Sequence, residues 1–147
     1  MKLAITMTNG GVAIMTLLGE EPDVERNIRL WIDANPGRYA SHRELGDGGQ
    51  IQQDRTFRDA WEDVGGAIVV SMPRARDLWR DKMRHARAGK LAALDTEYLR
   101  ADEMKNAEEK LRIAARKKEL RDVTAVPEIE AAKNTDELKA VWPDVLK

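Results

Sequence analysis

The long stretch of interleaved charged and apolar residues from Arg74 to Thr124 constrains the fold of this chain more than any other feature. Its apolar residues recur with a helical period for about fifty residues, with a soft interruption at Ala88-Gly89. Ser71-Met72-Pro73 stands directly before it, and a hydroxyl cap followed by an early proline is a typical helix start. We therefore predict a helix-rich C-terminal half.

Two apolar stripes divide this stretch: Leu91, Leu94, Tyr98 and Ala101 in the first, and Leu111, Ala114, Ala115 and Leu120 in the second. Lys105-Asn106 lies between them without an apolar anchor, and Asn is a poor residue inside a helix but a good cap. We predict two helices, at residues 90–104 and 107–122, folded as an antiparallel hairpin. One continuous helix with a coiled-coil partner is the alternative.

The N-terminus predicts a β-hairpin at residues 2–18. Leu3, Ile5 and Met7 alternate with other residues, as in a half-buried strand, and a return strand begins at Val12. Asn9-Gly10 between them is a strong hairpin signal, because both residues tolerate the positive φ of a type I′ turn. A two-stranded hairpin is marginally stable alone, so it must pack on another element.

The next segment predicts a helix that Glu21-Pro22-Asp23 opens and Asn35-Pro36-Gly37 ends. One apolar stripe at helical spacing supports it: Val24, Ile28, Trp31 and Ile32. We expect a short strand at Arg38–Leu45 and a flexible loop at Gly46–Gly49.

The middle and the end of the chain carry weaker signals. Residues 54–61 are interpreted as a helical turn or irregular segment, with Phe57 and Trp61 facing inward, and a strand is predicted at Ala67–Val70. A last short helix is capped from Asn134 onward and ends at Trp142-Pro143.

These elements predict an α+β protein. A small N-terminal unit with a β-hairpin, a helix and one or two further strands is followed by a helix-rich half with an antiparallel helical hairpin. We place a small αβ domain at residues 1–71 and a helical arm with a short C-terminal helix at residues 72–147.

The composition and the motifs give little indication of catalytic or metal-binding residues. The formal net charge of the 147 residues is −1, no cysteine is present, and His42 and His85 lack a metal-ligand partner at helical spacing. No nucleophile elbow or phosphate-binding loop with a lysine occurs. We expect no enzymatic activity, no cofactor, no metal and no membrane span. The N-terminus does not have the pattern of a signal peptide.

One segment is strongly basic. The segment from Arg74 to Lys90 contains seven basic and two acidic side chains, for a net charge of +5. This could indicate phosphate contacts, or a solvated helix whose arginines pair with carboxylates. The near-neutral total charge and the lack of a base-reading motif favour a protein contact over nucleic acid.

The tryptophans refine this interpretation. Trp31 and Trp61 lie on apolar faces and are predicted to be core residues. Trp79 interrupts the charged helix and Trp142 closes the chain, so both are candidate interface anchors, since Trp and Arg dominate binding hot spots. Packing within the monomer is the alternative. The predicted partner-binding residues are Trp79, Arg76, Arg80, Met83 and Trp142.

Five segments stand out: DRTFRDAW at 54–61, AIVVSMPRARDLWRDKMRHAR at 67–87, KLAALDTEYLRADE at 90–103, ARKKELRDVT at 115–124 and the Trp142-Pro143 ending. They resemble small proteins encoded beside the tail-fibre genes of tailed bacteriophages, including tail fibre assembly proteins. The resemblance covers residues 50–147. Similar proteins often have a glycine-containing turn where this chain has Met104-Lys105-Asn106.

The resemblance implies a non-enzymatic tail or tail-fibre-associated structural or adaptor protein of the virion. A transient tail fibre assembly chaperone is the main alternative, and a nucleic-acid-binding accessory protein the weaker one. Expected partners are other phage tail or fibre proteins, or further copies of the chain, with no membrane. The expected location is the host cytoplasm during assembly and then the virion tail.

Overall fold

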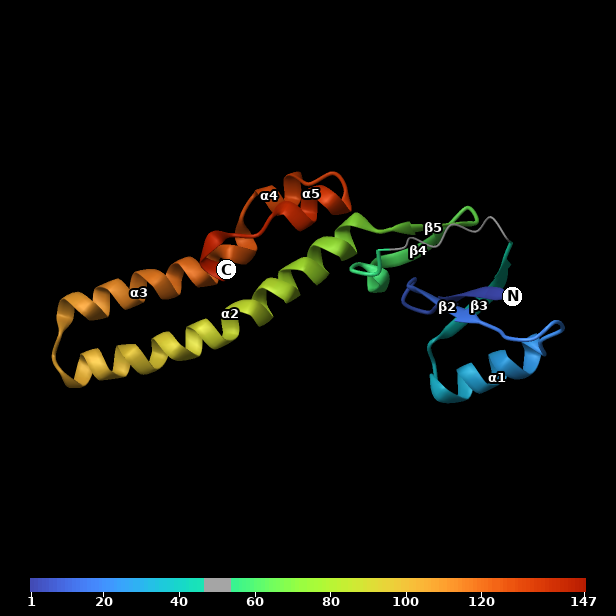
Figure 1. Cartoon of the computed structure of the whole chain (residues 1–147), viewed down its shortest axis with the longest axis horizontal. Helices are drawn as coiled ribbons and strands as arrows, with labels where there is room; N and C mark the ends of the chain where they lie inside the picture. The colour runs from blue at the N-terminus through green and yellow to red at the C-terminus, as the bar shows by residue number, and fades with distance from the viewer. Residues whose placement is uncertain (47–53) are drawn as a thin grey trace. The chain divides into compact units, whose positions relative to one another are not determined.

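The computed structural model describes residues 1–46 and 54–147, which form two compact units, Met1–Ala75 and Arg76–Lys147 (Figure 1). The class is α+β, as predicted. Of the predicted loop at Gly46–Gly49, all but Gly46 lies outside the described residues.

The strands are β1 (Lys2–Met7), β2 (Val12–Thr16), β3 (Tyr39–Leu45), β4 (Trp61–Val64) and β5 (Ala67–Val70). The helices are α1 (Val24–Ala34), α2 (Met72–Glu103), α3 (Ala107–Asp122), α4 (Glu128–Ala131) and α5 (Thr135–Ala140), with short 3₁₀ turns at Arg58–Ala60, Val123–Ala125 and Asp144–Leu146.

The predicted hairpin forms from β1 and β2, but with a different turn. Met7 accepts a hydrogen bond from the Gly10 amide and donates one to the Gly11 carbonyl, both at 2.8 Å. Gly10 has a φ of +77°, whereas Asn9 keeps a negative φ and accepts a bond from the Gly11 amide through its side chain. This is a three-residue loop with a glycine bulge, the next commonest hairpin connection after the two-residue turn.

The first unit has three layers, and its central sheet has the strand order β2-β1-β3. One face of the sheet packs on α1, with Leu3, Ile5 and Leu17 against Ile28. The predicted apolar stripe of α1 lies in this cluster. The helix begins as expected, because the Asp23 carboxylate accepts a hydrogen bond from the Arg26 amide at 2.9 Å.

A second, two-stranded sheet of β4 and β5 covers the opposite face. Trp61 and Ile68 pack there against Ala4, Val12 and Leu45. The strand β4 was not expected from the sequence. Its hairpin closes through Gly65 and Gly66, whose φ angles of +59° and +86° suit a two-residue primed turn. Phe57 and Trp61 are buried, as predicted.

The Arg43 side chain joins β3 to this second sheet through hydrogen bonds. The Arg43 guanidinium donates to the Asp63 carboxylate, with 3.1 Å between Nη2 and Oδ1, and to the Gly66 carbonyl at 2.7 Å. The hydrogen bond that Arg43 donates to the Asp63 carboxylate raises the pKa of Arg43. The contact fixes the turn of the second hairpin above the central sheet.

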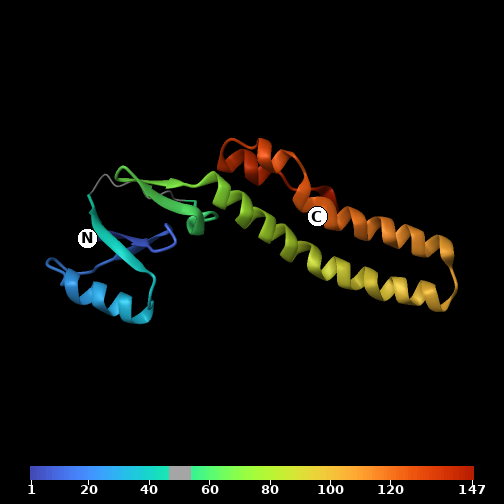
Figure 2. The same cartoon turned by 180° about the vertical axis from the view of Figure 1, so that it is seen from behind.

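The long helix α2 begins at Met72 as predicted and runs without a break through Ala88-Gly89. It ends in a Schellman motif, in which the Asn106 amide bonds to the Ala101 carbonyl and the Lys105 amide to the Asp102 carbonyl, both at 2.9 Å. Lys105 takes the left-handed position of this motif, with a φ of +52°. The chain then reverses, so α2 and α3 lie antiparallel in Figures 1 and 2, which confirms the hairpin and not the single continuous helix.

Asparagine caps set the starts of two helices in the second unit. The Asn106 side chain accepts from the Glu109 amide at 3.1 Å, and the Asn134 side chain accepts from the Glu137 amide at 2.9 Å. The short helix α5 was predicted, whereas α4 was not. The core of the unit includes Met83, Ile129 and Leu138, whose side chains are fully buried.

Candidate protein-binding sites

The basic face of α2 contacts the ends of the helices that follow it. Arg76 donates from Nε to the Ile129 carbonyl at 3.1 Å and from Nη2 to the Ala132 carbonyl at 3.0 Å. Arg87 donates from Nη1 to the carbonyls of Leu120 and Arg121, at 3.2 and 2.6 Å. Carbonyls at helix ends have no partner inside their own helix, and a cation there also meets the negative end of the helix dipole.

Arg80 lies between these two residues and completes what we call the arginine row: Arg76, Arg80 and Arg87. It donates from Nε to the Thr124 carbonyl at 3.3 Å and forms an ion pair with the Glu130 carboxylate. The hydrogen bond between the two side chains lowers the pKa of Glu130 and raises that of Arg80. The arginine row is therefore bonded within the second unit.

The predicted aromatic anchors contact each other. The Trp79 side chain is 5% exposed, and its Nε1 donates to the Val141 carbonyl at 2.8 Å. The rings of Trp79 and Trp142 meet edge to face, with 5.5 Å between centroids, and Lys82 Nζ lies 4.6 Å from the Trp79 centroid. Trp142 itself is half-buried.

The five predicted partner-binding residues thus lie in the interior of the second unit or at the edge of that interior. Met83 is fully buried, Trp79 nearly so, and the Arg76 and Arg80 side chains are 19% and 22% exposed. Their contact with a partner stays a prediction. In this conformation, Trp142 and the edges of the two guanidinium groups are the parts that a partner could reach.

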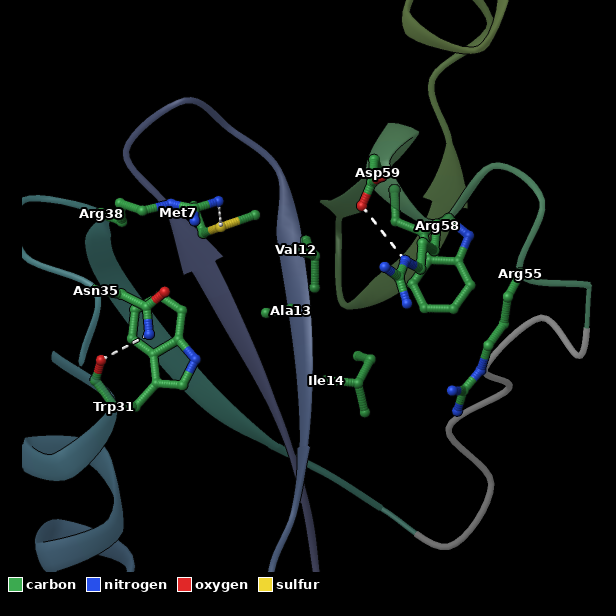
Figure 3. A pocket seen from close by; sticks show the side chains of 11 residues that line it. Met7, Val12, Ala13, Ile14, Trp31, Asn35, Arg38, Arg55, Arg58 and Asp59 are labelled. Atoms are coloured by element: carbon green, nitrogen blue, oxygen red, sulfur yellow. Dashed lines mark hydrogen bonds and ion pairs between the residues drawn. The ribbon is translucent and has the colours of Figure 1, made fainter. Parts of the chain in front are cut away.

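The first unit has a different feature that the sequence analysis missed, a pocket of about 310 Å³ beside β2 (Figure 3). We call it the β2 slot. Its apolar lining comes from β1, β2, α1 and β4: Met7, Val12, Ala13, Ile14, Trp31 and Trp61. Its polar lining is Asn35, Arg38, Arg55, Arg58 and Asp59. Figure 3 shows Arg55, Arg58 and Asp59 on one side of β2, and Trp31, Asn35 and Arg38 on the other.

The β2 slot is positively charged, since three arginines face one aspartate. Arg58 is paired weakly with Asp59, at 3.6 Å between Nε and Oδ1, and the Nη2 of Arg38 lies 3.3 Å from the Met7 sulfur. The Trp61 Nε1 is buried and has no hydrogen-bond partner within the described residues. Buried N–H groups are normally bonded, so the acceptor of this N–H lies outside the described residues.

The sequence contained one signal for this site, the inward-facing Trp61, but no pattern that joins it to Trp31.

Among residues 1–46 and 54–147, no cluster of three or more metal-ligating side chains occurs. No helix in that part of the chain is both long and apolar enough to cross a membrane. Known protein families, curated proteins and solved structures were all compared with the chain, and none matches it.

Proposed function

We propose that this chain is a non-enzymatic tail or tail-fibre-associated protein of a tailed bacteriophage, acting as a structural or adaptor protein of the virion. The observation that carries the proposal is that three of the resembling segments, far apart in sequence, pack together. Trp79 in segment 67–87 contacts the Trp142-Pro143 ending, and Arg80 and Arg87 bond to segment 115–124. Parts of these three segments are therefore packed together in the second unit.

The second unit also offers a surface for protein contact. Three large apolar side chains near the turn between α2 and α3 are exposed: Leu99, Met104 and Leu111, at 63%, 79% and 74%. Their exposure makes this end of the helical hairpin the candidate contact surface. The bonding of the arginine row within the unit reduces the number of cations available for phosphate, which disfavours the nucleic-acid alternative.

Mass spectrometry of purified, washed virions tests the proposal. A structural protein stays in the particles at a fixed ratio to the fibre protein. The matched variants are Met104→Glu, which changes an exposed apolar residue, and Lys105→Glu, which changes its polar neighbour. We expect the first to lower incorporation more than the second.

Two other results would favour the alternatives. Absence from washed particles, together with insoluble fibre protein when the gene is deleted, would identify a transient assembly chaperone. Retention of DNA with an affinity that falls steeply as salt rises would identify a nucleic-acid binder. Either result would overturn the virion assignment.

A further inference from the structure

Among residues 1–46 and 54–147, the outer edge of β2 has no strand partner along the β2 slot. β2 is a terminal strand of the central sheet as far as the described residues go, because its only strand partner there is β1. The Gly11 carbonyl and the Leu17 amide, at the two ends of β2, both bond to the β1 side. Successive residues of a strand alternate the direction of their N–H and C=O groups. Val12, Ile14 and Thr16 therefore point these groups away from β1.

An open strand edge is a template for a further strand, and natural proteins commonly block such edges with lysine, proline or a covering element. The five residues of β2 contain neither lysine nor proline. The edge lies instead between two aromatic walls, Trp31 on the α1 side and Trp61 on the β4 side. Both walls stay in place without an occupant, since Trp31 and Trp61 each belong to a core cluster.

The charges of the β2 slot indicate which kind of peptide segment it would bind. Arg38, Arg55 and Arg58 are exposed residues at the rim, and only Asp59 among the lining residues is acidic. Side chains of an added strand alternate between the two walls. Apolar residues on one face can therefore pack on Trp31, while acidic residues on the other face meet Arg55 and Arg58 on the β4 side (Figure 3). Strand addition supplies the affinity through main-chain hydrogen bonds, and the pockets supply the specificity.

We propose that the β2 slot binds an extended acidic segment of a partner protein, which adds to the sheet beside β2. The segment alternates acidic with β-branched or other apolar residues. The inference does not depend on the proposed function: the β2 slot would bind such a peptide even if virions lacked the chain. Conversely, a virion protein without this activity would disprove only the present inference.

The experiment uses the full chain and a fluorescent peptide of about eight residues, a typical strand length, that alternates glutamate with valine. Fluorescence anisotropy measures the affinity, and hydrogen exchange followed by NMR measures the protection of the Ile14 and Thr16 amides. We expect saturable binding together with slower exchange of these two amides. A peptide with lysine in place of glutamate should not bind.

Two matched pairs of variants separate charge from strand pairing. Arg58→Glu should weaken binding by about tenfold or more through charge reversal beside the peptide. Arg29→Glu, the same change on the exposed face of α1, should not. Thr16→Pro removes an outward N–H and should weaken peptide binding and the protection of the Ile14 amide, because proline is tolerated on strand edges but cannot donate. Thr16→Val keeps the N–H and should bind normally.

Four results would overturn the inference. They are no binding at millimolar peptide, binding without amide protection, equal binding of the lysine peptide, and unchanged binding by Thr16→Pro. A single-stranded oligonucleotide that competes with the peptide at equal affinity, and leaves the Ile14 amide unprotected, would assign the arginines to phosphate contacts instead.

Discussion

The two units use their arginines in opposite ways. In the second unit, the guanidinium groups of the arginine row donate to carbonyls at helix ends, and the face that looked available from the sequence is bonded internally. In the first unit, Arg38, Arg55 and Arg58 stand around a pocket with one acidic residue among them. A basic patch in a sequence therefore does not reveal a binding site until the acceptors of its N–H groups are known.

The largest effect that would test this comparison is expected for Met83→Ala. Met83 is fully buried in the second unit, and its truncation should lower the free energy of unfolding of that unit by about 2–5 kcal/mol. Hydrogen exchange followed by NMR should show α3 and α5 losing protection while β1 keeps its own. Leu111→Ala, at an exposed position, is the control. Equal loss in β1 would mean that the two units unfold together.

The next effect concerns the arginine row itself. Arg76→Ala leaves carbonyls of the α4 segment without donors and should cost about 1–3 kcal/mol in urea unfolding. Arg84→Ala removes only an exposed pair with Asp81 and should cost about 0–1 kcal/mol. If the two variants were equally stable, the arginine row would not stabilise the second unit.

A smaller, stabilising effect is expected at the turn after α2. Lys105→Gly removes the strain of a left-handed lysine and should raise the free energy of unfolding by about 0.5–1 kcal/mol. Lys105→Ala, which keeps a Cβ at that position, should give no such gain. A glycine variant with a lower urea midpoint would contradict the Schellman geometry.

The smallest effect is a dependence on pH. The folded pKa of Glu130 is lowered by Arg80, so its contribution to stability is present above the unfolded pKa and disappears as the pH falls through the folded value. The second unit should therefore lose stability in acid, below about pH 4.3, the ordinary glutamate pKa. Glu130→Gln should flatten this part of the pH profile, and Glu128→Gln, which keeps the ion pair between Arg80 and Glu130, is the matched control.

Local signals predicted much of the fold. Asp23, Asn106 and Asn134 all cap the helices that the sequence placed after them, because capping depends on residues within one turn. The strand β4 was missed although its turn residues, Gly65-Gly66, are a recognised hairpin signal. The alternation in Trp61–Val64 is too short to distinguish from a helical turn.

The candidate sites were much harder to predict, because their contacts join residues far apart in the chain. Arg76 and the Ile129 carbonyl are separated by 53 positions, and no sequence pattern marks a backbone acceptor. Trp61 is buried as predicted, whereas Trp31 is only partly buried, packed against a core cluster. Only the three layers of the first unit, however, place them on the two sides of β2.

The spacing of the arginine row limits which insertions and deletions the chain can tolerate. Each residue of an α-helix turns the next by about 100°, so one residue inserted between Arg80 and Arg87 would swing Arg87 away from the end of α3. Substitutions elsewhere on the helix leave that alignment intact. Among natural variants of this chain, insertions and deletions should therefore be rare between Arg76 and Arg87, while length changes collect around the turn at Lys105.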